Sequence, residues 1–220
     1  MINVTQAINE KFPSFGEKPE IVQKTTVSLL KKITHESEIN GFLDKYSDLK
    51  DFDFIEQVFD YFNFTYSASL RDKQNIPAQG RVVIIANHPI GSLDGLALLR
   101  QVGEVRSDVK IIANDMLMMF PQLHDLFIPV NNMTGKTFKA VYEGVTQALK
   151  QEQAVIVFPA GEVSRTSPTG IKDGRWRFGF INFARKTKSP ILPIHVKGKN
   201  SALFYSMSIL AKPLSTALLS

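Results

Sequence analysis

The 220-residue sequence contains no cysteine. This absence excludes disulfide scaffolds, thiolate zinc sites, iron–sulfur clusters and cysteine nucleophiles. The sequence also lacks a run of about 18 consecutive apolar residues, so a membrane-spanning helix is not expected. The first thirty residues carry three glutamates and no long apolar core, so they do not resemble a signal peptide. We therefore expect an intracellular protein that is soluble or bound to a surface.

The composition is typical of a folded domain. Hydrophobic residues make up 44% of the chain and charged residues 21%, which argues against wholesale disorder. A mass of 24.7 kDa suffices for one large domain, or for one domain with a helical appendage.

The formal net charge of +5 is unevenly distributed. Residues 36–60 hold eight acidic groups and two lysines, whereas residues 171–199 hold eight basic groups and one aspartate. Two solvated faces of opposite sign are the interpretation that charge alone favours. The functional alternative is a cationic surface for anionic lipid, an acidic carrier protein or nucleic acid.

The hydrophobic pattern changes near residue 70. Before that point, apolar residues recur at helical spacing over residues 19–33, 39–46 and 55–62. We interpret residues 1–70 as a helical N-terminal subdomain in which each apolar stripe faces a core.

After this point the pattern indicates strands alternating with helices. Apolar runs rich in β-branched residues predict buried strands at Val82–Ala86, Val109–Ala113, Phe127–Val130, Ala154–Phe158 and Ile191–Val196. Helical segments are expected between several of them, at Leu93–Val102, Thr137–Lys150 and Trp176–Lys186. This alternation predicts an α/β domain over residues 71–220, with a mainly parallel sheet flanked by helices.

The first candidate for chemistry is the segment Asn87–Gly91, which directly follows the first expected strand. His88 would lie at the carboxyl end of that strand, the edge where open α/β sheets bind ligands. A loop that folds back would bring Asp94 to the imidazole. The carboxylate would then fix the tautomer and leave the other ring nitrogen free as a base. The simpler alternative is that Asp94 only caps a helix and His88 only packs in a turn.

The second candidate is the loop Phe158–Arg165, which also follows a strand and is expected at the same sheet edge as His88. Arg165 would hold a phosphate or a carboxylate, and Glu162 would orient Arg165 or a substrate hydroxyl. The alternative is a surface ion pair at a turn, which contributes little energy. Two such loops converging on one edge favour the functional interpretation.

These motifs resemble the lysophospholipid acyltransferase superfamily, which includes the glycerol-3-phosphate and 1-acylglycerol-3-phosphate acyltransferases. The resemblance runs in order from about residue 36 to the end. Besides the two candidate loops, it rests on Asn75-Ile76-Pro77, Arg106 with Asp108-Val109, Ala113-Asn114-Asp115, Asp173-Gly174-Arg175-Trp176, Pro190-Ile191-Leu192-Pro193 and Lys199–Tyr205. The sequence is most similar to the subgroup labelled "putative hemolysin", which is related to the O-acyltransferases of bacterial ornithine-lipid and glycine-lipid synthesis.

The resemblance implies a glycerolphosphate acyltransferase-like fold and a His–Asp general-base mechanism. His88 would take the proton from a lysolipid hydroxyl and Asp94 would orient the imidazole. The hydroxyl oxygen would then attack the thioester of an acyl carrier protein or of coenzyme A, with no cofactor and no metal. Residues expected to bind substrate are Asn87, Gly91, Gly161, Glu162 and Arg165.

The sequence departs from the superfamily in three places. His88 and Asp94 are separated by five residues where the superfamily has four, and the glutamate and arginine of the Phe158–Arg165 loop are displaced. An arginine associated with an acceptor phosphate is replaced by Asn131-Asn132. The resemblance therefore favours a different lysolipid, such as a lyso-aminolipid.

Such substrates imply peripheral attachment to the cytoplasmic face of the inner membrane. The run Met116–Phe120 would carry acyl chains or dip into lipid, or else fill the core. Residues 203–219 would form an interfacial segment or a last core helix. Related chains continue further, so a piece of the enzyme is expected to be absent here.

There are four other interpretations, and the first two remain open. A thioester or lipid hydrolase would use the same dyad on water, and a non-catalytic lipid-binding module would use the basic stretch alone. A metal site from His88, Asp94 and either His124 or His195 is disfavoured, because single histidines are usually structural. Nucleic acid is disfavoured because no aromatic-and-basic recognition motif is present.

Overall fold

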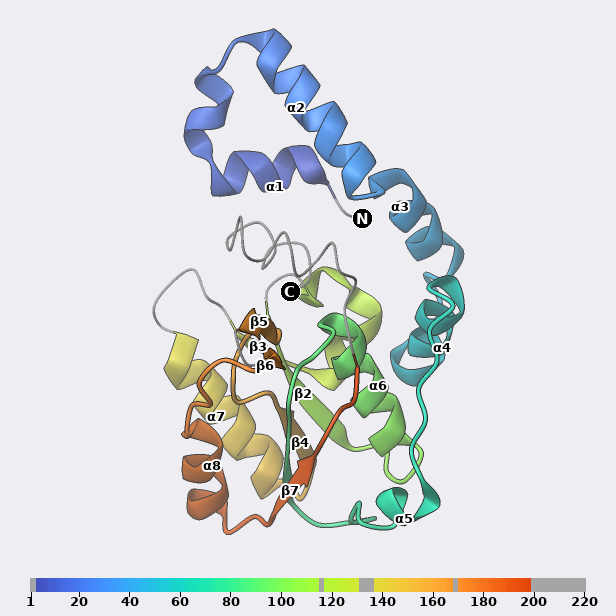
Figure 1. The fold of residues 1–220 in the computed structure, drawn as a ribbon, viewed down its shortest axis with the longest axis vertical. Coiled ribbons are helices and arrows are strands. Elements are labelled where there is room, and N and C mark those ends of the chain that lie inside the picture. Colours follow the sequence, from blue (N-terminus) through green and yellow to red (C-terminus); the bar gives the residue numbers. More distant parts are fainter. Residues whose placement is uncertain (1–2, 115–116, 131–136, 168–169, 199–220) are drawn as a thin grey trace. The chain divides into compact units, whose positions relative to one another are not determined.

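The computed structural model describes residues 3–114, 117–130, 137–167 and 170–198. The chain divides into two compact units, Met1–Leu49 and Lys50–Ser220. In its described part, the first unit consists of helices (Figure 1): α1 (Val4–Lys11), the 3-10 helix η1 (Pro13–Glu17), α2 (Glu20–Ile33) and α3 (Glu36–Lys45).

The sequence predicts a boundary at residue 70, which is C-terminal to the boundary between Leu49 and Lys50 in the structure. The reason is α4 (Asp51–Tyr61), which packs against α6 (Ser92–Gly103) and the 3-10 helix η3 (Pro121–Leu126) of the second unit. Phe54 of α4 is buried. The predicted stripe is buried at Ile55 and Phe59, but Phe62 at its end is 57% exposed. The stripe predicted over residues 19–33 is likewise exposed in α2, which has no buried residue, so the expectation that each stripe faces a core is wrong there. Helical spacing shows which residues share a face, but not what covers that face.

The second unit is built on a five-stranded sheet of order β3-β2-β4-β1-β7, and its strand pairs are parallel. The strands are β1 (Val82–Ala86), β2 (Val109–Asn114), β3 (Phe127–Val130), β4 (Ala154–Val157) and β7 (Ile191–Ile194). Each overlaps a predicted strand, and the predicted α/β class is confirmed. Elements that the sequence did not indicate are the antiparallel pair β5 (Arg165–Ser167) and β6 (Gly170–Lys172), and the short helices α5 (Leu70–Lys73) and η2 (Leu117–Met119).

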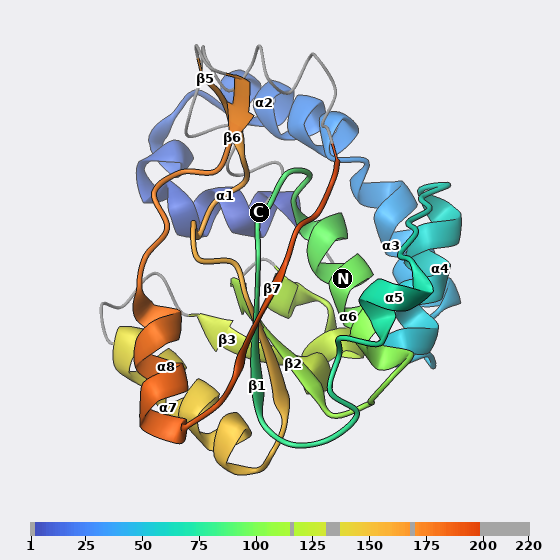
Figure 2. The same ribbon diagram turned by 60° about the horizontal axis from the view of Figure 1, so that its bottom comes forward.

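Helices cover both faces of the sheet (Figure 2): α7 (Thr137–Lys150) and α8 (Gly179–Thr187) lie on one face and α6 on the other. In β1, Val83 and Ile85 join the core beneath α7 and α8. Since side chains alternate along a strand, Ile84 points to the opposite face. The side chains of β1 are all buried, which explains why its sequence is continuously apolar.

Helix α8 begins later than the predicted residue 176. The N–H of Arg177 donates to the C=O of Pro159 at 2.9 Å. The segment before α8 is therefore tied to the loop after β4, and the helix starts at Gly179.

Arg106 joins the segments that lead into three strands. Its side chain is 2% exposed. Its guanidinium donates to both carboxylate oxygens of Asp108, at 2.7 and 2.8 Å, just before β2. It also donates to the C=O groups of Pro77 and Gly80, before β1, and of Glu152, before β4. One buried cation thus fixes how these strands enter the sheet.

Replacing Arg106 with alanine is expected to lower the free energy of unfolding by about 3 kcal/mol, because hydrogen bonds to a charged group contribute about 1.5–3 kcal/mol each and are not additive. Urea unfolding at neutral pH measures this loss. The matched control is Arg81→Ala, which removes a more exposed ion pair with Glu152 and one bond to the C=O of Thr187, and is expected to cost less than Arg106→Ala. Equal losses in the two variants would contradict the role given to Arg106.

The same comparison depends on pH. The Arg106 guanidinium holds the pKa of the Asp108 carboxyl below its ordinary value. The stability that this lowered pKa contributes is present above the ordinary pKa of aspartate, about 3.9, and is lost as the pH falls through the lowered pKa. The difference in unfolding free energy between the wild type and Arg106→Ala should therefore become smaller in strong acid. The bonds to the three carbonyl groups keep it from vanishing.

Candidate active site

The loops that follow three neighbouring strands meet at one edge of the sheet. Strands β4, β1 and β7 are adjacent and parallel, so the segments 158–165, 87–91 and 195–198 all leave from their carboxyl ends. Ligands bind at this edge in open α/β sheets. Both loops singled out in the sequence are among the three.

The loop after β1 brings His88 and Asp94 together. The Nδ1 atom of His88 lies 3.2 Å from Oδ2 of Asp94, and the two side chains are 16% and 1% exposed. The atoms are within ion-pair distance, but their alignment falls short of a hydrogen bond, so Nδ1 has no hydrogen-bond partner among the described residues. Catalytic hydrogen bonds are often poorly aligned before substrate binds. With Nδ1 directed at the carboxylate, Nε2 is the nitrogen left for a substrate.

Asp94 also shapes the loop that carries His88. Its Oδ2 accepts the N–H groups of Ile90 and Gly91, at 2.7 and 3.1 Å. The φ of Gly91 is 118°, a conformation that side chains other than hydrogen disfavour. Asp94 thus caps the first turn of α6 and approaches the imidazole with the same oxygen. The two interpretations of Asp94 drawn from the sequence therefore describe a single arrangement.

The loop after β4 covers one face of the imidazole. The ring of Phe158 stacks on that of His88, with ring centroids 3.9 Å apart and an interplanar angle of 18°. Phe158 directly follows β4, so its position is set by the sheet. His88 is therefore held on one side by an aromatic ring and at Nδ1 by a carboxylate.

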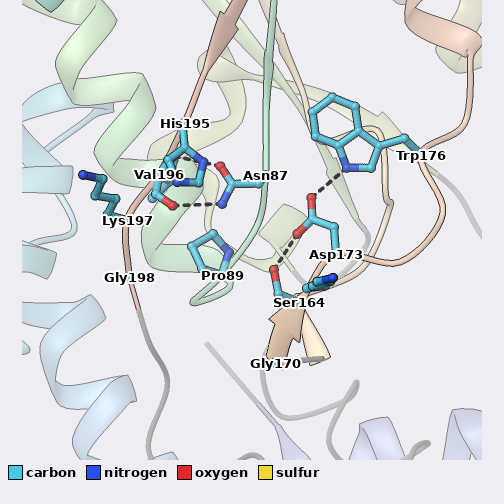
Figure 3. A pocket seen from close by; sticks show the side chains of 11 residues that line it. Asn87, Pro89, Ser164, Gly170, Asp173, Trp176, His195, Val196, Lys197 and Gly198 are labelled. Carbon is cyan, nitrogen blue, oxygen red and sulfur yellow. Dashed lines mark hydrogen bonds between the residues drawn. The ribbon is translucent and has the colours of Figure 1, made fainter. Parts of the chain in front are cut away.

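A third set of contacts, which sequence reasoning missed, holds the backbone of His88. Its C=O accepts the N–H of Ser164 at 2.7 Å, and its N–H donates to Oδ1 of Asp173 at 3.2 Å. Asp173 also accepts the Ser164 hydroxyl and, at 2.8 Å, Nε1 of Trp176 (Figure 3). The Asp173-Gly174-Arg175-Trp176 motif was the available signal, but nothing in the sequence places it against His88.

The segment after β7 is tied to Asn87. The side-chain amide of Asn87 donates to the C=O of Val196 at 2.8 Å, and its oxygen accepts the N–H of Val196 at 2.7 Å. At Val196 the Asn87 side chain thus replaces the backbone hydrogen bonds of a neighbouring strand. For this reason β7 ends at Ile194 and not at the predicted Val196. A Cβ atom at Gly198 would lie 2.6 Å from Cδ1 of Ile90, so this segment packs closely on the His88 loop.

Glu162 and Arg165 form an ion pair, with Nε of Arg165 3.0 Å from the Glu162 carboxylate. The Arg165 side chain is 17% exposed and that of Glu162 is 44% exposed. Gly161, with a φ of 69°, makes the turn before them. This geometry matches the structural alternative drawn from the sequence, and the predicted substrate-binding role of the pair stays a prediction.

A cavity of about 1040 Å³ opens at this edge of the sheet (Figure 3). Its described lining consists of Asn87, Pro89, Ser164, Gly170, Lys172, Asp173, Trp176, His195, Val196, Lys197 and Gly198. Asn87 and Pro89 flank His88 in sequence, and Ser164 and Asp173 bond to its backbone. Of the residues predicted to bind substrate, Asn87 lines the cavity. The other predicted site residues are not among its described lining residues: His88, Asp94, Gly91, Gly161, Glu162 and Arg165.

Several sequence features fall at or beyond the limits of the described residues. Asn131-Asn132, Met116 and residues 203–219 lie outside them.

His124, one candidate ligand of the disfavoured metal site, lies within the described residues, and its Nε2 is 2.7 Å from the C=O of Met118. In the part of the chain that the structure describes, no three His, Asp or Glu residues are grouped to hold a metal ion.

Comparison with known proteins supports the resemblance seen in the motifs. A family model described as "Acyltransferase" matches residues 6–218. A protein from Bacteroides thetaiotaomicron named lyso-glycine lipid O-acyltransferase is 33% identical over 215 residues, which are 97% of this chain and 77% of the relative. A protein of the same name from Phocaeicola vulgatus is 31% identical over 200 residues, 90% of this chain and 71% of the relative.

These names do not bear on the "putative hemolysin" label, which stays a prediction. Both the family model and the relatives cover nearly the whole chain, including the loop of His88 and Asp94 and the loop Phe158–Arg165. The chain therefore belongs to the lysolipid acyltransferase family and is an O-acyltransferase.

Proposed function

We propose that the protein transfers a fatty acyl group from an acyl carrier protein or coenzyme A thioester to the hydroxyl of a lyso-glycine lipid, in bacterial membrane lipid synthesis. The observation that carries the mechanism is the approach of His88 to Asp94 at the carboxyl edge of the sheet, 3.2 Å between Nδ1 and Oδ2. The acceptor is proposed from the name shared by the two relatives.

In this mechanism Nε2 of His88 takes the proton from the acceptor hydroxyl, and Asp94 stabilises the imidazolium. The hydroxyl oxygen forms a bond to the thioester carbonyl carbon, and the carbon–sulfur bond breaks. The thiolate leaves and receives the proton from the imidazolium, so no further cofactor is needed. A positioned base contributes roughly 10²–10⁴-fold, and the orientation of two bound substrates supplies much of the remainder.

The charges around the cavity suit an acidic acceptor. Glycine joined to a lipid through its nitrogen keeps its carboxylate. The ionisable lining residues are Lys172, Lys197, His195 and Asp173. Both oxygens of Asp173 already accept hydrogen bonds, and neither lysine pairs with an acid among the described residues. The lining thus keeps positive charge available, and the ring of Trp176 offers it an apolar wall.

Replacing Lys172 with glutamine is expected to raise the KM for the lyso-glycine lipid about tenfold, the effect of losing about 1.4 kcal/mol of attraction to its carboxylate. The KM for the acyl donor and kcat are expected to change little, because Lys172 does not contact the dyad. Steady-state kinetics with each substrate varied in turn measure this. Lys188→Gln, which removes an exposed lysine of the same basic stretch outside the cavity, is the control. An equal rise in KM in that variant would contradict the assignment.

We further propose that the protein attaches peripherally to the cytoplasmic face of the inner membrane. Helix α2 supports this, because it exposes apolar side chains: Ile21, Val22, Leu29 and Ile33. An exposed apolar helix face with lysines on the same helix, here Lys31 and Lys32, is typical of interfacial binding. No helix within the described ranges is long and apolar enough to cross a bilayer.

The proposed function is tested by incubating the purified protein with a labelled acyl donor and a panel of acceptors. The panel contains lyso-glycine lipid, a lysophospholipid bearing a phosphate, and no acceptor. We expect label in the O-acylated glycine lipid. Release of labelled free fatty acid at the same rate with and without acceptor would indicate a hydrolase. Binding of lipid without either product would indicate a non-catalytic module.

A further inference from the structure

Asp173 lies where three separate parts of the site meet. It follows β6 and precedes α8, and its carboxylate receives donors from the loop after β1, from the loop after β4 and from its own segment. Figure 3 shows Asp173 between Ser164 and Trp176, joined to each. A carboxylate with two oxygens thus gathers three donors: the His88 N–H, the Ser164 hydroxyl and Nε1 of Trp176.

His88 depends on these bonds for its backbone position. It lies beyond the end of β1, where the ladder of the sheet no longer fixes the main chain. Its N–H is held by Asp173 and its C=O by Ser164, which is itself bonded to Asp173. The contacts with Asp94 and Phe158 fix the orientation of the ring, but the position of the ring also depends on the position of the His88 backbone. Catalytic groups must be held to within about 0.5 Å by such supporting bonds.

We propose that Asp173 is a positioning residue for His88: its carboxylate holds the main chain of His88, through a direct bond and through Ser164, so that the imidazole meets the acceptor hydroxyl. The inference rests on the proposed function of His88 as the base. It gives Asp173 no contact with the reacting atoms. The predicted signature is therefore a loss in kcat without a rise in KM.

Asp173→Ala removes all three bonds. We expect kcat to fall about 10²-fold, the cost that a displacement of about 1 Å has at a catalytic group. The KM values for the acyl donor and the acceptor should not rise, in contrast to Lys172→Gln, because loss of the Asp173 charge removes no attraction to an acidic acceptor. Asp60→Ala, at an exposed position on α4, is the control and should keep the wild-type kcat. A folded Asp173→Ala protein with unchanged kcat, or with its loss confined to KM, would overturn the inference.

A second pair of substitutions tests the bonds themselves and holds even where Asp173→Ala fails to fold. In Asp173→Asn, the amide oxygen can still accept from His88 and Ser164, but the NH₂ group then faces Nε1–H of Trp176, donor against donor. Trp176→Phe removes that opposing donor and keeps an aromatic ring. The double variant is therefore expected to recover kcat relative to Asp173→Asn alone. Losses that simply multiply in the double variant would overturn the inference.

The outcomes also separate this inference from the proposed function. A His88→Ala protein with full acyl transfer would remove the base and, with it, any role of Asp173 through that base. An inactive His88→Ala protein beside an Asp173→Ala protein of wild-type kcat would leave the proposed function standing and overturn the positioning role alone.

Discussion

Replacing His88 with alanine is expected to lower kcat for acyl transfer by about 10²–10⁴-fold, the contribution of a positioned general base. The reason is that the imidazole is the titratable group that the carboxyl edge of the sheet presents next to a buried carboxylate. The KM values for both substrates should change little, since Asn87 and Pro89 still form the cavity wall on either side. Radiolabelled transfer from acyl donor to lyso-glycine lipid measures the loss.

The matched control for His88→Ala is His35→Ala, at an exposed histidine paired with Glu38 in the first unit. It should keep the wild-type rate. We expect both variants to fold, because the ring of His88 contributes one stacking contact, with Phe158. A thermal unfolding scan tests this. A folded His88→Ala protein that transfers acyl groups at the wild-type rate would exclude His88 as the base.

The second large effect is expected at Asp94, where charge and geometry can be separated. One oxygen, Oδ2, meets the N–H groups of Ile90 and Gly91 and Nδ1 of His88. In Asp94→Asn the amide oxygen can take this place, so the loop keeps its bonds while the negative charge is lost. We expect kcat to fall about 10–10²-fold, the difference between a charge-assisted and a neutral hydrogen bond, with stability within about 1 kcal/mol of wild type.

Asp94→Ala removes the hydrogen-bond acceptor as well as the charge, and we expect it to lower stability in addition to kcat. Two N–H groups of the loop lose their partner, and each buried unsatisfied donor costs about 1–3 kcal/mol. Unfolding free energy and kcat should therefore fall together, whereas Asp94→Asn lowers kcat alone. Equal stability of the alanine and asparagine variants would contradict the capping role of Asp94.

The sheet and the place of the site could be predicted from the sequence because both follow from local patterns. Strands buried on both faces are continuously apolar, as in Val82–Ala86, and this pattern needs no knowledge of the partner strands. The loops that follow such strands must leave at the carboxyl edge of the sheet. The sequence therefore predicts the edge of the sheet at which His88 and the loop Phe158–Arg165 lie.

What could not be predicted depends on contacts between distant residues. The bond between His88 and Asp173 joins positions 85 residues apart, and β5 and β6, which precede Asp173, are too short and polar to show a strand pattern. Arg106 was recognisable as part of a motif, but its carbonyl partners lie in loops without any pattern. The sequence predicts that Asn87 binds substrate, but it does not show that the Asn87 amide bonds to the backbone of Val196.

The bond between Trp176 and Asp173 has a practical consequence, since Trp176 is the single tryptophan of the chain. Its indole lies edge-on to Phe180, with centroids 6.4 Å apart, and at the wall of the cavity. The intrinsic fluorescence of the protein, excited selectively at the indole, therefore originates at the wall of this cavity. Titrating lysolipid while following the emission maximum would report occupancy of this cavity without any attached dye.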